Sequence, residues 1–519
     1  KNHMDILWHN YTDKKDKTPI LRAPLPAKAS IVGRVGIMML ACGTGAWRVR
    51  SSMNTLSELM NMTCTVDIGL MSINYTCFDG NDSFNQSLCL TNTGVNTSQL
   101  NRLEKFVTHF HEKELVQSCE AIHSALDDIE KVHGLYSPTT LAFAAALACS
   151  AFTFLLGGGI VEMLCAFAGA GIGNYLRGKL SRKHLTLFLC IISSVSAACL
   201  SYTALLKLLE LIFSVKLQHE AGYICSMLFI IPGFPFITSG IDLAKLDMRS
   251  GTERLAYALI IVTVSTMTAW ILAMLLGLRP IPFLPLNLAL WQRILFRLIA
   301  GFCGVFGFSI MFNSPVRLAT AASIIGAISN TLRLELIDLC ALPPAAAAAI
   351  GAFLAGILAS TLKGVAGYPR ISITVPSIVI MIPGLYLYKG FYNLGIMNLT
   401  SAASWLASAL LIILALPLGL IFARIRHFVI VPDRHDAIWM SEANLQPGIR
   451  CNLPEYQPQF HQGYRLDNAH KDTILKTRSK QLPQVISSKA FSLLKRRVLL
   501  LPQKKRLYDR MEKRNLLVY

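Results

Sequence analysis

The chain has 519 residues, of which 53% are hydrophobic and only 15% charged, and its formal net charge is +19. Soluble domains contain about 25% charged residues, so this composition, with a mean hydropathy of +0.47, excludes an ordinary soluble protein and indicates a polytopic membrane protein. The basic excess lies near the hydrophobic segments and in the tail. It favours anionic lipid as a partner, and nucleic acid is not expected because no basic stripe with stacking aromatic residues is present.

Residues 30–138 predict a small soluble α/β domain, which follows a flexible leader over residues 1–29. The leader is polar and charged throughout, so an export signal is not expected. The predicted elements of the domain are a helix, a strand, a returning strand after an Asp-Gly turn, and a second helix, over residues 30–62, 65–75, 87–91 and 98–131. Arg34, Arg48 and Arg50 argue against a membrane span in the first helix.

Ten hydrophobic segments follow, each close to the roughly 20 residues that cross a bilayer as a helix. They cover residues 139–156, 160–176, 185–206, 221–243, 255–277, 294–311, 316–334, 344–362, 371–393 and 402–424. The predicted fold class is therefore a membrane all-α protein with about ten transmembrane helices in two five-helix halves, 139–278 and 279–432. An odd number of spans in each half makes the second half inverted relative to the first, so an inverted repeat is expected.

The connecting loops indicate how the chain is oriented. Lys and Arg are more frequent in the loops on the side of the N-terminal domain than in those on the opposite side, which predicts cytoplasmic N- and C-termini. Residues 433–519 form a basic tail with 17 Lys and Arg against 8 Asp and Glu. Within it, residues 489–506 mix basic and apolar side chains, which predicts either a membrane-surface segment or a plain disordered tail.

Two of the hydrophobic segments are interrupted by proline. The first reads ICSMLFIIPGFPFITSGIDL over residues 224–243, and the second reads SIVIMIPGLYLYKG over residues 377–390. Proline inside a helix removes a backbone hydrogen bond, and lipid tolerates such a break only against protein or a wet cavity. Paired interruptions in the two halves point to a transporter's binding site, although two ordinary proline-kinked helices would give the same pattern.

These considerations select the candidate substrate-binding residues. Backbone groups freed at the breaks would bind a zwitterion, Thr238 and Asn313 would contact a hydroxyl group, and Arg317 would hold a carboxylate or anchor the chain at the lipid interface. The predicted set is Pro232, Gly233, Pro235, Thr238, Asp242, Asn313, Arg317, Pro383 and Gly384.

Two carboxylates are candidates for proton coupling, because ionisable residues within membrane segments are usually functional. Glu162 lies at the start of the second segment, where a carboxylate also suits the helix dipole without any transport role. Asp242 ends the first interrupted segment and could instead pair with Lys245.

Catalytic and nucleotide-binding motifs are missing from the sequence. No GxxxxGK[ST], HExxH or GxSxG pattern occurs, and the 13 cysteines show no metal-ligand spacing. The chain is therefore not expected to be an enzyme, and neither a cofactor nor a metal is expected.

Several short motifs resemble those of the threonine/serine exporter family in its fused, single-chain form. Gly43-Thr44-Gly45-Ala46-Trp47-Arg48-Val49 resembles the G-x-Y-R-V motif of the family's soluble portion, with Trp47 in place of Tyr, and Gly94-Val95-Asn96 resembles its "VN" stretch. The family's second half is matched by Phe312-Asn313-Ser314-Pro315, Pro369-Arg370 and Ile382-Pro383-Gly384. The resemblance covers roughly residues 30–430.

The resemblance implies a secondary active exporter of small amino acids in the cytoplasmic membrane, driven by the proton gradient through antiport. The expected partners are the amino acid, protons and membrane lipid, and the sequence leaves open whether the chain forms a homo-oligomer. Export of a succinate-like dicarboxylate is an alternative, because some two-chain relatives are associated with it. A non-transporting membrane scaffold is a second alternative.

Overall fold

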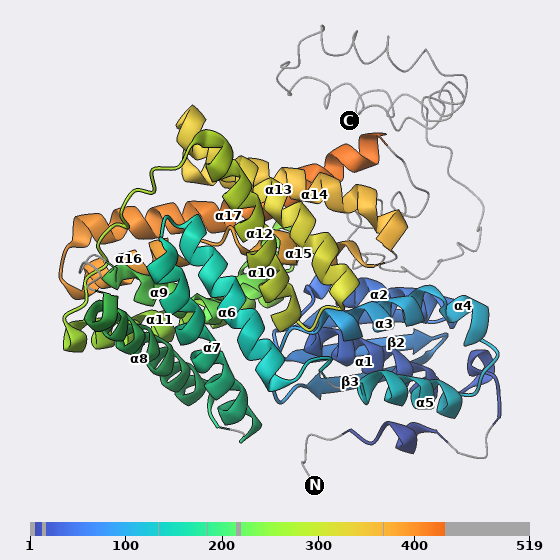
Figure 1. Cartoon of the computed structure of the whole chain (residues 1–519). Coiled ribbons are helices and arrows are strands. Elements are labelled where there is room, and N and C mark those ends of the chain that lie inside the picture. The colour runs from blue at the N-terminus through green and yellow to red at the C-terminus, as the bar shows by residue number, and fades with distance from the viewer. Residues whose placement is uncertain are drawn as a thin grey trace, which may run out of the picture. The chain divides into compact units, whose positions relative to one another are not determined.

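The computed structural model describes residues 6–12, 17–132, 134–183, 185–213, 219–366 and 368–430, which belong to one unit of the chain, Lys1–Gln446 (Figure 1). The basic tail predicted over residues 433–519, with its segment 489–506, lies outside the described residues. So do residues 1–5 and 13–16 of the predicted leader.

The N-terminal domain contains a three-stranded antiparallel sheet in the order β1-β2-β3. Its strands are β1 (Thr63–Ile68), β2 (Ser72–Asp79) and β3 (Asp82–Cys89). The single strand predicted over residues 65–75 is wrong, because the chain turns at Gly69, whose N–H donates to the carbonyl oxygen of Ser72 at 2.8 Å. The turn between β2 and β3 is confirmed, since Gly80 has a φ of 62° that glycine adopts without steric cost.

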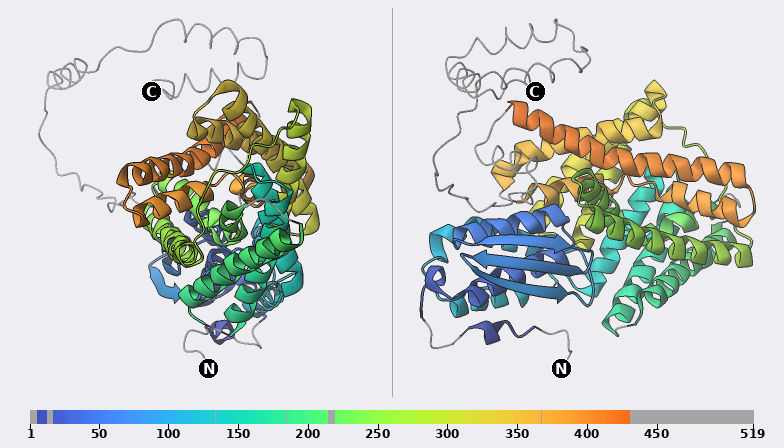
Figure 2. Two further views of the ribbon diagram at one scale, coloured as in Figure 1. Left: turned by 60° about the vertical axis from the view of Figure 1, so that its left-hand side comes forward. Right: turned by 180° about the vertical axis from the view of Figure 1, so that it is seen from behind.

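Short and long helices complete this domain. They are η1 (Trp8–Tyr11), η2 (Ile20–Arg22), α1 (Leu25–Ala41), α2 (Ala46–Leu59), α3 (Thr97–Thr108), α4 (Phe110–Lys113) and α5 (Cys119–Glu130). Helices α1 and α2 contact the sheet, whose strands form an outer layer in Figure 2. Helix α1 begins five residues before the predicted start at Ser30, and the described leader packs on the domain through the buried Trp8, whose ring stacks on His123 with centroids 6.3 Å apart.

Helix α1 is buried along almost its whole length although it carries charged residues. The Arg34 guanidinium pairs with Asp127 and, at 2.7 Å, with Glu130, while Lys28 pairs with Asp79 at 3.0 Å. Buried charges are tolerated when they are paired in this way. Among the described helices, α1 is not a candidate membrane span, as the arginines predicted.

The rest of the described chain is helical. Its elements are α6 (Pro138–Leu155), α7 (Ile160–Arg182), α8 (Leu187–Phe213), η3 (Glu220–Gly222), α9 (Tyr223–Ser226), η4 (Leu228–Ile230), α10 (Gly233–Ala244), α11 (Met248–Leu276), α12 (Leu290–Met311), α13 (Val316–Cys340), α14 (Pro344–Ala366), α15 (Arg370–Val379), α16 (Gly384–Gly395) and α17 (Leu399–Ile430). Large apolar side chains remain exposed on these helices, among them Leu164, Leu211, Leu275, Trp291 and Leu410. Such surfaces are rare in water and suit a lipid environment.

Six of these helices, α6, α8, α11, α12, α14 and α17, are long and apolar enough to cross a membrane. The number rises to eight within the described ranges if each of two bent helix pairs is one span. The segments predicted as the second and seventh spans are also helical, as α7 and α13, but they carry several charged residues and fall below the hydropathy of the others. Six to eight candidate spans are therefore shown where the sequence predicted ten.

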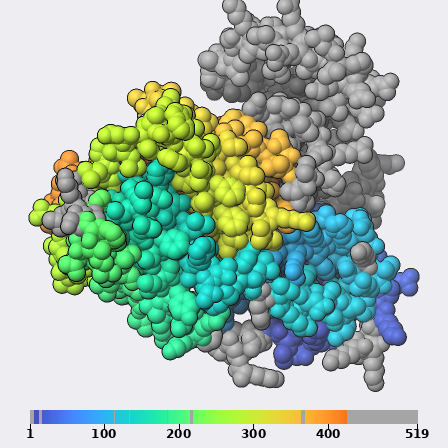
Figure 3. All heavy atoms as spheres, viewed as in Figure 1, coloured from blue at the N-terminus to red at the C-terminus, as the bar shows by residue number. Residues whose placement is uncertain are grey.

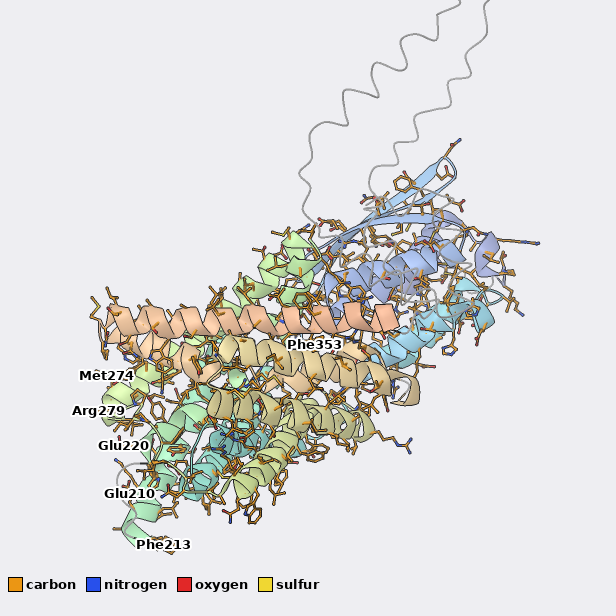
Figure 4. The ribbon with its side chains drawn as sticks, turned by 90° about the horizontal axis from the view of Figure 1, so that it is seen from above. Glu210, Phe213, Glu220, Met274, Arg279 and Phe353 are labelled. Carbon is orange, nitrogen blue, oxygen red and sulfur yellow. The ribbon has the colours of Figure 1, made fainter. Side chains whose placement is uncertain are left out.

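The N-terminal domain lies at one end of the helical part. Figure 4 shows Glu220, Met274 and Arg279 at the opposite end, which we call the far end. We call the contact of residues 42–46 and 96–97 with the helical part the junction.

Candidate functional site

The two predicted breaks have the same local geometry. Pro232 has φ −80° and ψ 69°, and Pro383 has φ −81° and ψ 54°. After each proline, the glycine N–H donates to the isoleucine carbonyl two residues earlier, at 2.8 Å in the first break and 2.9 Å in the second. The helix direction changes by 57° at the first break and by 49° at the second. Both predicted interruptions are therefore present.

The breaks also pack against each other in a reciprocal manner. A Cβ atom on Gly233 would come within 2.4 Å of Val379 Cγ2, and one on Gly384 would come within 2.8 Å of Leu228 Cδ2. Each glycine thus contacts the residues that precede the other break. The cavity between them has a volume of about 20 Å³ and apolar walls that include Phe152 and Phe308. This volume suits about one water molecule, so an amino acid does not fit between the breaks in this conformation.

Helix α13 brings polar groups to the second break. A Cβ atom on its Gly326 would lie 2.7 Å from the carbonyl oxygen of Ser377, and Arg333 Nη1 donates to the carbonyl of Met381 at 2.9 Å. The buried side-chain oxygens of three successive residues on this helix accept no hydrogen bond in the described chain: Ser329, Asn330 and Thr331. Unpaired buried polar atoms are costly, so each of these oxygens would gain from a hydrogen bond that the described chain does not supply. Sequence reasoning missed them, although the polar run Ser329-Asn330-Thr331 in a largely apolar helix was a signal.

Asp242 lies at the junction and not between the breaks. Its fully buried carboxylate accepts the N–H of Ala46 at 3.1 Å and the hydroxyl of Ser250 at 3.1 Å, and it lies 3.5 Å from Arg254 Nε. Arg254 in turn donates to the carbonyl of Gly43 at 3.1 Å. The alternative of an Asp242–Lys245 pair is replaced by this arrangement, which joins α10 and α11 to the first turn of α2.

Gly45 is required by the same contact. A Cβ atom at this position would lie 2.6 Å from Asp242 Oδ1, well inside van der Waals contact, so only glycine permits this approach. The glycine of the Gly-Ala-Trp-Arg-Val motif thus has a structural explanation.

Asn313 forms a second connection at the junction. Its Nδ2 donates to Asn96 Oδ1 at 2.8 Å, and its Oδ1 accepts the N–H of Leu135 at 2.6 Å. Beside it, the hydroxyls of Thr97 and Ser314 are 2.7 Å apart. The space-filling view shows the α12–α13 hairpin, in yellow, against the cyan part of the N-terminal domain (Figure 3). The "VN" motif and the Asn-Ser-Pro motif therefore connect the N-terminal domain to the second half of the helical part.

The remaining predicted residues are dispersed. Pro235 lies in the first turn of α10, and the Thr238 hydroxyl donates to the carbonyl of Phe234 at 3.1 Å, within its own helix. Arg317 is exposed at the start of α13. Glu162 is buried at the start of α7, where it accepts the Gly159 N–H at 3.0 Å and lies 2.8 Å from His219 Nδ1. The structure therefore brings Pro232-Gly233 and Pro383-Gly384 together, with Pro235 in the turn that follows the first pair. The polar and charged residues of the predicted set make their printed contacts elsewhere in the chain.

Trp47, the residue that departs from the family motif, is surrounded by cations. Lys245 Nζ lies 3.4 Å from its ring centroid, and the guanidinium carbons of Arg48 and Arg424 lie 5.0 and 5.2 Å from ring centroids of the same indole. Burial lowers the pKa of Lys245 to about 7, and the neighbouring Arg424 and Arg48 add to the effect. The indole faces offset this clustering of positive charge by cation–π attraction.

Comparison with known proteins gives two family matches. The model described as "Putative threonine/serine exporter" matches residues 30–276, and that described as "Threonine/Serine exporter, ThrE" matches residues 297–425. Together the matches cover well over half of the chain. The chain belongs to the threonine/serine exporter family. It has the fused form, with both portions in one polypeptide, as the sequence motifs predicted.

Membership of the exporter family makes the chain a multi-pass membrane protein of a transporter family rather than an enzyme family. The family implies threonine or serine as the substrate. Searches of curated proteins and of solved structures gave no match. Among the described residues, no cluster of His, Cys, Asp or Glu could hold a metal ion.

Proposed function

We propose that this chain is a secondary active exporter that carries threonine or serine out through the cytoplasmic membrane in exchange for protons. In this proposal both termini are cytoplasmic and the ten predicted segments all lie in the membrane as two inverted five-helix halves. The observation that carries the proposal is the reciprocal packing of the two breaks, because a scaffold has no need for paired broken helices at one place.

The directions of the helices support an inverted relationship between the halves. Helix α10 runs from its break to the junction, since Lys245 follows it and contacts Trp47. Helix α16 instead leads to α17, which reaches Trp47 only at Arg424. At 1.5 Å per residue, the start of α17 is therefore about 37 Å from the junction. Helices that follow the two breaks thus run in opposite directions.

Transport in this proposal requires the breaks to separate. Separation would expose the backbone groups beside Gly233 and Gly384 and the unpaired oxygens of residues 329–331, which together suit a zwitterion with a hydroxyl group. Glu162 is the better candidate for proton coupling because it pairs with a titratable His219, whereas Asp242 is engaged at the junction. Alternation between closed and open breaks would then carry the substrate across.

The experiment is a paired measurement on Pro232→Ala and Pro383→Ala. Both prolines precede a helix with φ near −80°, which alanine also adopts, so each change should cost the folded protein at most about 1 kcal/mol. We expect normal membrane abundance and loss of threonine efflux from vesicles with an imposed pH gradient. Normal abundance with normal efflux would refute a transport role for the breaks, and efflux independent of the pH gradient would refute proton coupling.

The alternatives are decided in the same vesicles. Efflux of succinate in preference to threonine and serine would show a dicarboxylate exporter. Absence of efflux for amino acids and dicarboxylates alike, with correctly folded protein, would support the scaffold.

A further inference from the structure

A cavity of about 350 Å³ lies at the far end of the helical part, on the opposite side of the breaks from the junction. Its volume is within the range of small-ligand pockets. Residues 280–286 of the linker between α11 and α12 form an apolar wall. The short helices η3 and α9, which precede the first break, contribute Ala221 and Ile224. Helix α16, which follows the second break, contributes Leu385 and Lys389. Both broken segments therefore border this cavity, and their movement would change its connection to the space between the breaks.

The cavity has a charged side made by α12 and α13. Arg297 donates to Glu335 at 2.6 Å and to Asp338 at 2.6 Å, and Arg293 donates to Glu335 at 3.0 Å. Arg293, Arg297 and Asp338 line the cavity itself.

Lys389 adds a further positive charge that no carboxylate balances. Its Nζ lies 4.7 Å from the ring centroid of Trp405, and it forms no ion pair with any described residue. The lining contributes three cationic side chains and the carboxylate of Asp338, and the Glu335 carboxylate pairs with both arginines from outside the lining, which leaves one positive charge in all. A site with one uncompensated cation and a nearby carboxylate is complementary to one carboxylate and one ammonium group.

We infer that this cavity is a release-side binding site for a small zwitterionic amino acid, with the substrate carboxylate at Lys389 and the substrate ammonium at Asp338. The inference rests on the proposed function and names the place where the substrate is held after it passes the breaks. The apolar linker wall would contact the side chain of the amino acid. A dicarboxylate fits poorly, because its second carboxylate would face Asp338.

The test uses the full chain in vesicles of known orientation, with Lys389→Met and the matched control Lys207→Met. Lys207 is an exposed residue of α8 that does not line the cavity. When threonine is supplied at the far-end face, we expect its KM to rise at least about tenfold in Lys389→Met, as the loss of a charge-assisted hydrogen bond predicts. The KM at the opposite face and both KM values of Lys207→Met should stay unchanged, and Lys389→Arg should restore most of the affinity.

Competing ligands test the chemical class. Threoninamide lacks the carboxylate and 3-hydroxybutyrate lacks the ammonium group, so both should compete with threonine weakly at the far-end face. Lys389→Met should abolish the preference for threonine over threoninamide, and Asp338→Asn should reduce the preference for threonine over 3-hydroxybutyrate.

Failure of the inference can be told apart from failure of the proposed function. Wild-type protein that transports threonine, with Lys389→Met unchanged in KM and in ligand preference, would overturn the release-side site alone. Wild-type protein that transports neither threonine nor serine would overturn the proposed function. Succinate competing better than threonine at the far-end face would overturn the assignment to an amino acid.

Discussion

The carboxylate of Asp242 accepts the backbone N–H of Ala46 at 3.1 Å although the two residues are 196 positions apart in the chain. This contact places a membrane-segment carboxylate at the first turn of α2, where it satisfies one free donor and suits the helix dipole. Through Arg254 the same carboxylate is linked to Gly43. The junction is therefore held by a buried pair of opposite charges, Asp242 and Arg254, which also bonds to the backbone of Gly43 and Ala46.

Asp242→Ala should destabilise the junction strongly, because it leaves the buried Arg254 without its partner. Breaking a buried ion pair on one side costs about 3–5 kcal/mol, and the free energy of unfolding should fall by an amount of this order. Chemical denaturation of the purified full chain measures it. Asp67→Ala is the control, since its pair with Arg249 is exposed on both sides and should contribute at most about 1 kcal/mol. Equal effects of the two changes would contradict the anchoring role of Asp242.

Asn313 should act in stability and not in substrate selection. It has a φ of 58°, which glycine adopts freely and alanine adopts at a cost of about 1–2 kcal/mol. We therefore expect Asn313→Ala to be less stable than Asn313→Gly by about 1 kcal/mol, while both keep the threonine-to-serine ratio of efflux. A changed ratio in a stable Asn313→Gly protein would return Asn313 to the substrate site.

Gly384→Ala should disrupt the contact between the breaks, because the new methyl group meets Leu228 Cδ2 at 2.8 Å. Leu228→Ala removes that atom, and the next nearest atom, Ile231 Cγ1, would lie 3.5 Å from the new methyl group. We expect Gly384→Ala to lower threonine efflux severalfold and the double variant to regain much of it. Gly178→Ala, where nothing lies within 4 Å, should leave efflux unchanged. Without rescue in the double variant, the reciprocal packing would not be the cause of the loss.

The N-terminal domain should lose stability in acid through His123. Burial lowers the pKa of this histidine from 6.5 to about 4, with Arg34 adding to the effect. The unfolded chain thus binds more protons between about pH 4 and 6.5, so stability rises with pH across this window and falls on acidification. The shift corresponds to at most roughly 3 kcal/mol.

His123→Gln should remove that part of the pH dependence, which thermal unfolding of the full chain between pH 4.5 and 7.5 would measure. His111→Gln is the matched control, because its side chain is 55% exposed. If both variants retain the wild-type pH profile, another group is responsible for the acid sensitivity.

Some features of this protein follow from local sequence alone. Pro232 and Pro383 favour a helix break locally, because each lacks the backbone N–H and its ring clashes with the preceding turn. Pro376 and Pro417 lie inside α15 and α17, so proline alone does not decide where a helix breaks. Long apolar segments are helical because in lipid each segment has to satisfy its own backbone hydrogen bonds. Arg34 likewise indicated from the sequence that its helix lies outside the membrane. The family motifs likewise depend only on short stretches. The strand boundary at Gly69 was missed, because an isolated glycine in an alternating pattern does not by itself separate a bulge from a turn.

The roles of Asp242, Asn313 and Lys389 depend on the tertiary structure. In sequence, Asp242 is a carboxylate at the end of a membrane segment, and only the approach of α2, nearly 200 residues earlier, makes it an anchor. Asn313 is a loop amide in the sequence, and only the fold gives it hydrogen bonds with Asn96 and Leu135. The burial and the charge environment of each residue depend on partners that are distant in the chain. The spacing of residues along a single segment does not predict which partners these are.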